Sequence, residues 1–376
     1  MTTEKKRRKI LVAMMDGFGP DYLQASDMPN LKTMIKGGSY KTVSACMPTV
    51  TNINNASICT GEYPEVHGIT ANSYFDLATK KEHYMDKAEL LLAPTIFEKA
   101  KKAGMKSALL TAKVKTITLL NRGADVIGAA EQPTRQWVDA LGVPADIYSA
   151  EINYWIWKAA LTLLQERSDI DLFYCHTTDY TMHMSDPLGE ASQTYLHETD
   201  KLFGRLWNES PDMEFYLTAD HGMGFKRRCY DLNKYMPEKG LPIFFAMSAE
   251  RDPYIKHHRT FGGTAYLWLN RIGDYLKAVD ILRRTEGIEA VYSKYEAASL
   301  FHLRPDRIGD IMAVGDRWTV FGPLDGAVED LPEDFRAHGS LYEVPVPLVI
   351  YNAKVDYSEW DDYVSNCHLT SHIVFD

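Results

Sequence analysis

The sequence is poor in three features that would place it in a specialised class: paired cysteines, excess basic charge and long apolar runs. Its five cysteines, Cys46, Cys59, Cys175, Cys229 and Cys367, have no CxxC spacing, so a disulfide framework is a poor interpretation and a reducing cytoplasm fits better. The net charge of −10 argues against a nucleic-acid partner, because binding the phosphate backbone needs a basic surface. No stretch approaches the roughly 20 apolar residues of a membrane span. We therefore expect a cytoplasmic protein with no nucleic-acid or membrane partner.

What is present is the composition of an ordinary globular protein. Of 376 residues, 45% are hydrophobic and 24% are charged, which excludes disorder and fibrous repeats. The length suits two domains, or one large α/β domain with an insertion. The basic start, MTTEKKRRK, leads into an apolar run that stops at Asp16 without a cleavage site. We interpret it as a solvated tail before a first strand, not as a signal peptide.

Short apolar runs alternate with amphipathic segments, a pattern typical of parallel strands joined by helical crossovers. A polar residue follows each of the four clearest runs. The runs and these residues are 9–15 with Asp16, 107–112 with Lys113, 171–176 with Asp179, and 214–219 with Asp220. Ligands of open α/β sheets bind beyond the carboxyl ends of the strands. The sequence therefore predicts an α/β fold with a doubly wound, mostly parallel sheet and a crevice at its strand ends.

The pattern changes in the third quarter of the chain. Strand-like segments at 264–269, 290–292, 308–314 and 318–321 surround a helical stretch at 272–284. They predict a small α+β insertion that caps the crevice. The run 344–351 then returns to the main sheet, and its two prolines favour an edge position. The expected domains are a core over 1–230, an inserted cap over 231–332 and a return to the core over 333–376.

Aspartates and histidines gather at the predicted strand ends. Asp179 and His183 would share one face if a helix begins there, and Asp220-His221 directly follows a strand. One such residue alone is more often a cap or a satisfied core group. The full set of three carboxylates and three imidazoles is Asp16, Asp179, His183, Asp220, His221 and His338. Mixed oxygen and nitrogen ligation of that number suits two zinc-like ions better than magnesium, which prefers oxygen.

Thr51 stands after Pro48, where a helix rich in hydroxyl and amide side chains begins; that helix is expected to end at Gly61. Threonine before a helix is usually an N-cap. The alternative is a nucleophile, since metal coordination lowers the pKa of a hydroxyl and a helix N-terminus stabilises a nearby anionic centre. The residues alone leave both interpretations open.

Lys113 and Lys115 lie two residues apart at the end of a predicted strand. If the strand continues through them, both ammonium groups face one side and form a clamp for an anion. A helix would place them about 200° apart and destroy the clamp. The remaining interpretation is an exposed pair, because lysine is usually solvated.

The order of these motifs resembles the alkaline phosphatase superfamily. The segments that carry the resemblance are Asp16-Gly, Pro-Thr-Val-Thr51-Asn, Val-His-Gly with Asn72 and Asp76, Thr-Ala-Lys113-Val-Lys115, Thr-Thr-Asp179-Tyr-Thr-Met-His183, Thr-Ala-Asp220-His221-Gly and Ala-His338-Gly. The nucleotide pyrophosphatase/phosphodiesterase branch is the nearer relative. Within it, the lysine pair and the stretch around Asn72 are most similar to the phosphonoacetate hydrolases. His257 and His258 also resemble a family segment of the cap, with surface histidines as the alternative.

The resemblance implies a core of alkaline phosphatase type with two zinc ions per chain, other divalent transition metals being alternatives. The implied ligands are Asp179, His183 and His338 for one ion, and Asp16, Asp220, His221 and Thr51 for the other. Thr51 would also be the nucleophile. Asn72 would donate a hydrogen bond to a phosphonyl oxygen, and Lys113 and Lys115 would bind the rest of the substrate.

The expected reaction is hydrolysis of the carbon–phosphorus bond of phosphonoacetate to acetate and phosphate. Three carboxylates and one alkoxide balance two divalent ions, so a substrate with nearly three negative charges needs the cations of Lys113 and Lys115. The alternative is a type I phosphodiesterase or nucleotide pyrophosphatase with the same metals, and a metal-dependent binding protein is a third. The expected partner is a small anionic phosphonate; a homodimer stays open.

Overall fold

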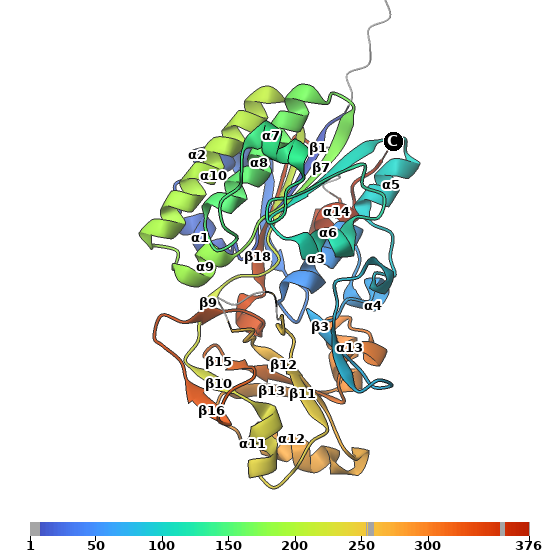
Figure 1. Ribbon diagram of the computed structural model, residues 1–376, viewed down its shortest axis with the longest axis vertical. Helices are drawn as coiled ribbons and strands as arrows, with labels where there is room; N and C mark the ends of the chain where they lie inside the picture. The colour runs from blue at the N-terminus through green and yellow to red at the C-terminus, as the bar shows by residue number, and fades with distance from the viewer. Residues whose placement is uncertain (1–7, 253, 255–258, 354–357, 376) are drawn as a thin grey trace, which may run out of the picture.

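The computed structural model describes residues 8–252, 254, 259–353 and 358–375. His257 and His258 lie outside the described residues, so their predicted contribution to the cap stays a prediction. The chain forms two lobes, one above the other in Figure 1. The upper lobe is built on a seven-stranded sheet and the lower lobe on a four-stranded sheet.

The upper sheet has the mostly parallel arrangement that the sequence predicts. Its strands, in order across the sheet, are β2 (Ser39–Ser44), β18 (Pro345–Tyr351), β8 (Glu214–Thr218), β1 (Ile10–Met14), β7 (Ile170–His176), β5 (Lys106–Thr111) and β6 (Val126–Ala129). The strands from β8 to β6 are parallel, and β1 lies centrally between β7 and β8. Every residue of β1 and β7 is buried, as expected for parallel strands covered on both faces.

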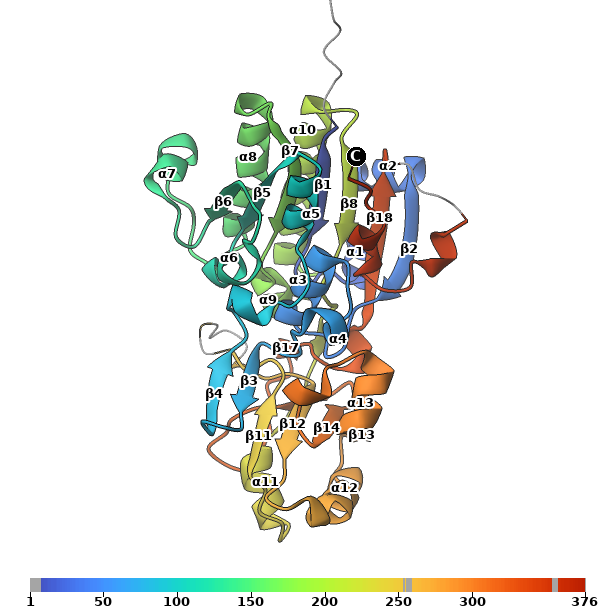
Figure 2. The same cartoon turned by 90° about the vertical axis from the view of Figure 1, so that its right-hand side faces the viewer.

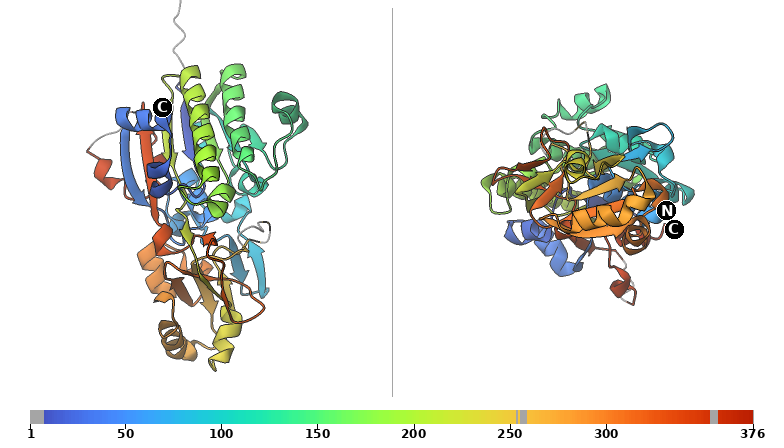
Figure 3. Two further views of the ribbon diagram at one scale, coloured as in Figure 1. Left: turned by 90° about the vertical axis from the view of Figure 1, so that its left-hand side faces the viewer. Right: turned by 90° about the horizontal axis from the view of Figure 1, so that it is seen from below.

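Helices cover both faces of this sheet, as Figures 2 and 3 show from opposite sides. One face is covered by α2 (Pro29–Gly37), α8 (Glu151–Glu166) and α10 (Glu190–Glu209), and the other by α3 (Thr51–Thr60), α5 (Ile96–Lys102), α6 (Val114–Leu120) and α14 (His368–Ser371). Buried Trp157, Phe203 and Phe215 pack edge to face beneath α8 and α10. The doubly wound core predicted from the alternation of apolar runs is therefore confirmed.

Strand β18 lies inside the sheet, so the predicted edge position was wrong. It pairs antiparallel with β2 on one side and with β8 on the other. Pro345 and Pro347 pair with β2, whereas pairing with β8 begins at Leu348. The prolines are tolerated because they precede the stretch in which two neighbouring strands require N–H donors.

The lower lobe has its own sheet and its own core. The sheet order is β11 (Phe245–Ser248), β12 (Thr264–Trp268), β14 (Ile311–Gly315) and β13 (Ile288–Ser293), flanked by α11 (Leu232–Glu238), α12 (Tyr275–Arg283) and α13 (Lys294–Phe301). Buried Met236, Leu267 and Leu282 belong to a cluster separate from the main core. The predicted cap, 231–332, lies between β9 (Gly224–Phe225) and β17 (Arg336–Ala337), which pair at the junction of the lobes.

Shorter elements lie between these, in addition to the 3-10 helices η1 (Ala88–Leu90), η2 (Ile272–Asp274), η3 (Pro305–Arg307), η4 (Leu341–Glu343) and η5 (Trp360–Asp362). They are α1 (Pro20–Ala25), α4 (Pro64–His67), α7 (Arg135–Leu141), α9 (Tyr180–Met184), the hairpin β3 (Ser73–Asp76) and β4 (Lys81–Tyr84), and the small sheet of β15 (Thr319–Phe321), β10 (Arg228–Tyr230) and β16 (Val328–Asp330). Among the helices that the structure describes, none has the length and apolar character to cross a bilayer. The carboxyl ends of β1, β5, β7 and β8 point toward the lower lobe (Figures 1 and 2).

Candidate metal centre

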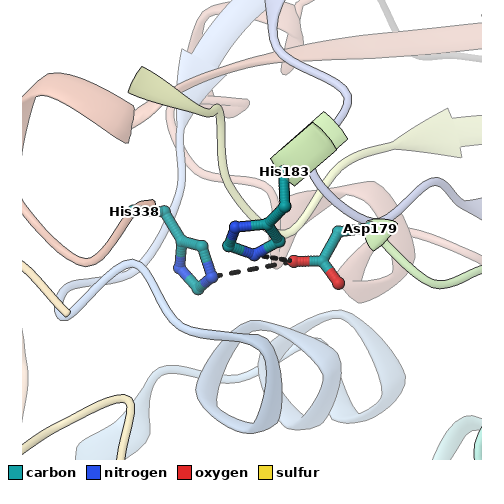
Figure 4. A group of neighbouring side chains, drawn as sticks. All are labelled: Asp179, His183 and His338. Atoms are coloured by element: carbon teal, nitrogen blue, oxygen red, sulfur yellow. Dashed lines mark ion pairs between the residues drawn. The ribbon is translucent and has the colours of Figure 1, made fainter. Parts of the chain in front are cut away.

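The structure brings the six aspartates and histidines singled out in the sequence together at these strand ends. They form two groups, Asp179 with His183 and His338, and Asp16 with Asp220 and His221. Within each group, donor atoms of the three side chains lie within 4.8 Å of one another, and all six residues are buried. Figure 4 shows the first group.

Local structure explains how the first group forms. Asp179 is the N-cap of α9, and His183 lies one turn later on the same face. The His183 Nε2 atom is therefore 2.8 Å from Asp179 Oδ2. His338 follows β17, and its Nε2 atom is 3.7 Å from the same oxygen. A helix does begin at Asp179, which is the condition under which the sequence placed Asp179 and His183 on one face.

The second group comes from two neighbouring strands. Asp16 lies two residues beyond β1 and Asp220 two residues beyond β8. His221 Nε2 is 3.3 Å from Asp220 Oδ2 and 3.6 Å from Asp16 Oδ1. Adjacent parallel strands thus place three donors in one small volume.

The backbone fixes how the three imidazoles face the carboxylates. Each Nδ1 atom lies against a carbonyl oxygen: His183 at 2.7 Å from Arg336, His221 at 2.9 Å from Gly222 and His338 at 2.8 Å from Thr49. Because a carbonyl oxygen only accepts, each Nδ1 carries a hydrogen, so the Nε2 atoms are the ones directed at the carboxylates. A metal ion between an Nε2 atom and a carboxylate would be bound by both. The donor set therefore fits metal ions.

The charges of the site lead to the same conclusion. Burial, reinforced by the neighbouring Asp16, raises the pKa of Asp220 well above its ordinary value. Burial and the adjacent His221 and His183 lower the pKa of His338 well below its ordinary value. Among the described residues, Asp16 Oδ1 and Asp220 Oδ2 are buried atoms without a hydrogen-bond donor. So many buried acceptors are costly unless cations bind them.

Thr51 is the first residue of α3, so its interpretation as the N-cap was wrong. The N-cap is Val50, whose own side chain makes no capping hydrogen bond. The Thr51 hydroxyl instead lies 3.5 Å from His221 Nε2, beside the second group. The helix ends at Gly61 as predicted, with that glycine in the left-handed region. The N-terminus of α3 is thus directed at the candidate metal centre.

Asn72 is buried beside the start of α3. Its Oδ1 atom accepts a hydrogen bond of 3.1 Å from the Asn52 backbone N–H. Its Nδ2 atom has no hydrogen-bond acceptor within the described part of the chain. The amide is therefore held in one orientation with donors left for a ligand.

The strand ends before the lysine pair. The predicted clamp required the strand to continue through both lysines, so that condition was wrong. β5 ends at Thr111 and α6 begins at Val114. The interpretation as an exposed pair was also wrong, because the Lys113 and Lys115 side chains are only 4% and 9% exposed. Lys113 Nζ is 2.9 Å from Asp16 Oδ2, and Lys115 Nζ contacts Asp252 Oδ2. Both ammonium groups therefore turn inward, from the N-cap and the first turn of a helix.

Sequence reasoning missed three buried residues of this region. His176, the last residue of β7, has its Nε2 atom 3.5 Å from Asp16 Oδ2. The rule that pointed to polar residues at strand ends could have found it. Glu250 and Asp252 come from the lower lobe, and Glu250 Oε2 lies 3.7 Å from His338 Nδ1. No local pattern marks these two residues.

A sequence comparison decides the family. Residues 10–341 match the family described as type I phosphodiesterase / nucleotide pyrophosphatase. The chain belongs to this family. The resemblance to the nucleotide pyrophosphatase/phosphodiesterase branch of the alkaline phosphatase superfamily is thereby confirmed. The two candidate metal-binding groups lie within the matched residues.

Individual relatives show how far this similarity extends. A venom phosphodiesterase of Macrovipera lebetinus is 28% identical over 225 residues, which cover 57% of this chain and 25% of the relative. The chain thus spans about a quarter of that curated relative. The solved phosphonoacetate hydrolase of Sinorhizobium meliloti 1021, in complex with phosphonoformate, has a TM-score of 0.88 and 28% identity. That similarity covers 97% of this chain and 95% of the hydrolase.

Proposed function

We propose that this family member is a zinc-dependent hydrolase that cleaves phosphonoacetate to acetate and phosphate, with Thr51 as its nucleophile. The observation that carries the proposal is the pair of buried ammonium groups, Lys113 and Lys115, beside the six-residue donor set. A phosphodiester needs no such pair. A substrate with a carboxylate next to its phosphonate does. The similarity to the Sinorhizobium meliloti hydrolase along nearly the whole chain supports the same substrate.

The proposed metal ligands are the two groups described above. Asp179, His183 and His338 would hold one zinc ion, and Asp16, Asp220, His221 and Thr51 would hold the other. Such ions, when bound, lower the pKa of a coordinated hydroxyl and offset negative charge on substrate oxygens. The carbonyl partners of the three Nδ1 atoms orient the imidazoles for this role.

Thr51 begins the reaction by attacking phosphorus in line with the bond to carbon. A phosphothreonine forms as the carbon–phosphorus bond breaks, and the bonding electron pair leaves with carbon. The N-terminus of α3 and the Asn72 amide stabilise the charge on the phosphonyl oxygens. Water then hydrolyses the phosphothreonine, releasing phosphate and restoring the Thr51 hydroxyl.

The lysines act on the leaving group. The electron pair on carbon is stable only when it delocalises into the neighbouring carboxylate as an enediolate, which carries more negative charge than the substrate carboxylate. Two ammonium groups in a buried site stabilise that charge strongly. A proton from solvent, which balances the one that the Thr51 hydroxyl gives up on attack, then adds to carbon and gives acetate.

The test is phosphate release from phosphonoacetate compared with hydrolysis of a 4-nitrophenyl phosphodiester. We expect phosphonoacetate to be the better substrate. Lys113→Ala and Lys115→Ala should each lower kcat/KM for phosphonoacetate roughly tenfold to a hundredfold, because each removes a charged hydrogen bond. Equal losses on both substrates would show that the lysines support the fold or the metal centre instead.

The second candidate is a type I phosphodiesterase, which the family match and the venom relative favour. It would use the same donor set and Thr51 on a phosphodiester with an alcohol leaving group. In that case, the wild-type protein would hydrolyse the 4-nitrophenyl ester rapidly and release no phosphate from phosphonoacetate.

A further inference from the structure

A short segment of the lower lobe, residues 249–252, reaches into the metal centre and is fastened on both sides. The Ala249 carbonyl accepts from the Asn72 backbone N–H at 2.9 Å. The Arg251 carbonyl accepts from the Ser73 hydroxyl at 2.7 Å, and the Arg251 guanidinium bonds Glu82 at 2.7 Å. These bonds hold the segment against β3 and β4.

Asp252 ends this segment as a fully buried carboxylate with a distinct role for each oxygen. Its Oδ1 atom accepts from the Tyr84 hydroxyl at 3.1 Å and from the Tyr254 backbone N–H at 2.9 Å. Its Oδ2 atom contacts the Lys115 ammonium. Two donors on one oxygen fix the carboxylate, so the other oxygen holds the ammonium in a set place.

The two lysines therefore differ in their partners. Lys113 is paired with Asp16 and Asp179, at 2.9 and 3.5 Å, and both belong to the ligand groups. Asp252, the partner of Lys115, belongs to neither group. Metal ions held by the two groups would compete for the partners of Lys113 and would leave the pairing of Lys115 intact.

We propose that Asp252 is a positioning residue that holds the Lys115 ammonium at the end of the site where the substrate carboxylate binds. The inference rests on the proposed function. An ammonium has three N–H donors, so contact with Asp252 leaves others for the substrate. Without this carboxylate, a flexible lysine side chain beside another buried cation would turn away toward solvent. Specificity for a carboxylated phosphonate thus depends on a residue that does not itself touch the substrate.

The experiment compares Asp252→Asn with Glu82→Gln, which breaks the neighbouring Arg251 pair on the same segment without touching Lys115. Phosphonoacetate and methylphosphonate, which lacks the carboxylate, are measured as competitive inhibitors of 4-nitrophenyl phosphodiester hydrolysis. The readout is the ratio of their two inhibition constants in each protein. We expect the preference for phosphonoacetate to fall about tenfold in Asp252→Asn and to stay within about twofold of wild type in Glu82→Gln.

Two further variants guard against misfolding and nonspecific effects. Tyr84→Phe keeps the carboxylate but removes one of its two fixing donors, and it should lower the preference about threefold. Lys115→Ala should lose the preference by itself, with no further loss when Asp252→Asn is added, because the two residues act as one unit. Additive losses in the double variant would overturn the inference.

Other outcomes separate this inference from the proposed reaction. Equal weakening of both phosphonates in Asp252→Asn would mean a merely structural role and would overturn it. Tighter binding of phosphonoacetate would mean that Asp252 competes with the substrate, which would also overturn it. A wild-type protein that releases no phosphate from phosphonoacetate, yet binds it with an Asp252-dependent preference, would contradict the reaction and support the role of Asp252.

Discussion

At the scale of single residues, the hydroxyl of Thr51 takes no part in capping α3. Val50 takes the N-cap position, and the hydroxyl faces His221. Removing the Thr51 hydroxyl therefore breaks no capping hydrogen bond within the described residues. In this segment, the candidate nucleophile and the helix N-cap are therefore two neighbouring residues, Thr51 and Val50.

Replacing Thr51 by Ala should separate activity from stability. Turnover should fall at least about a thousandfold, because no other side chain replaces the nucleophile. The free energy of unfolding should change by no more than about 1 kcal/mol, since only a hydroxyl without a capping role is lost. Phosphate-release assays and urea unfolding measure the two effects. Near-normal turnover would exclude Thr51 as the nucleophile.

His176 should tune the affinity of the metal centre through Asp16. Its Nδ1 atom accepts from three possible donors, Asn55, Thr111 and Thr116, at 3.0 to 3.1 Å, so the hydrogen is on Nε2, which faces Asp16 Oδ2. His176→Ala should weaken zinc binding roughly tenfold to a hundredfold. Competition with a chromogenic chelator measures the affinity, and circular dichroism checks the fold. Unchanged zinc affinity would contradict a role in holding Asp16.

Part of the site could be predicted because the positions of its residues follow from local pattern, whereas Asn72 and the grouping of His338 came from the resemblance of motifs. Asp16 and Asp220 stand directly after apolar strands, and one helical turn joins Asp179 to His183. Asp252 follows no such pattern, because tertiary folding alone brings it to Lys115. The predicted lysine clamp required a strand through both lysines, and only the turn after Thr111 shows that the strand ends before them.

At the scale of elements, α3 is fixed at both ends. Its start faces the metal centre, and its end at Gly61 lies against α14. Gly61 has a φ of +71°, and a Cβ there would lie 2.8 Å from the Ser371 Cα atom. Backbone cannot give way as the end of a side chain can. Only glycine therefore suits this close approach.

Gly61→Ala should destabilise the protein more than a matched substitution elsewhere. Gly104 has a similar φ of +75°, and a Cβ there would meet no described heavy atom within 4 Å. Gly104→Ala should cost about 1 kcal/mol of unfolding free energy, the conformational part alone. Gly61→Ala should cost about 1–3 kcal/mol more because of the clash with α14. Urea unfolding of both variants measures the difference; equal losses would contradict the clash.

The type of each element was predictable where the pattern of apolar residues was strong, whereas the position of β18 in the sheet was not. The four apolar runs became β1, β5, β7 and β8 because strands buried on both faces have few polar residues. The prolines of β18 indicated an edge strand. Its position is decided instead by which of its residues pair with β8. Pro345 and Pro347 precede the stretch that pairs with β8, and a sequence does not reveal where pairing begins.

At the scale of the whole molecule, buried histidines make the fold sensitive to acid. His67 is fully buried, its Nδ1 accepts from the Ile69 N–H and its Nε2 lies 2.8 Å from the Ser57 hydroxyl. Burial, with a contribution from Arg307, lowers the pKa of His67 to about 3. Between that value and the ordinary value near 6.5, the unfolded chain binds a proton that the folded chain does not. Stability therefore falls as the pH drops below about 6.5.

Unfolding in urea at pH 7 and pH 5 should show this loss. His67 alone should account for about 2 kcal/mol of the loss in unfolding free energy between the two pH values. In His67→Gln, the dependence of unfolding free energy on pH should be shallower by about one proton in this range. An unchanged slope would show that other groups cause the acid sensitivity.

The order of segments along the chain has a consequence for synthesis on the ribosome. Strand β2 is made early, but it joins the sheet through β18, which follows the entire lower lobe. Once β8 is made, its edge that receives β18 also stays open until β18 follows. By then Asp16, Asp220 and His221 have all been synthesised, whereas the group of Asp179 and His183 still lacks His338. A nascent chain can therefore complete one candidate ligand group well before the other, and if both groups bind metal as proposed, loading during translation would proceed in two steps.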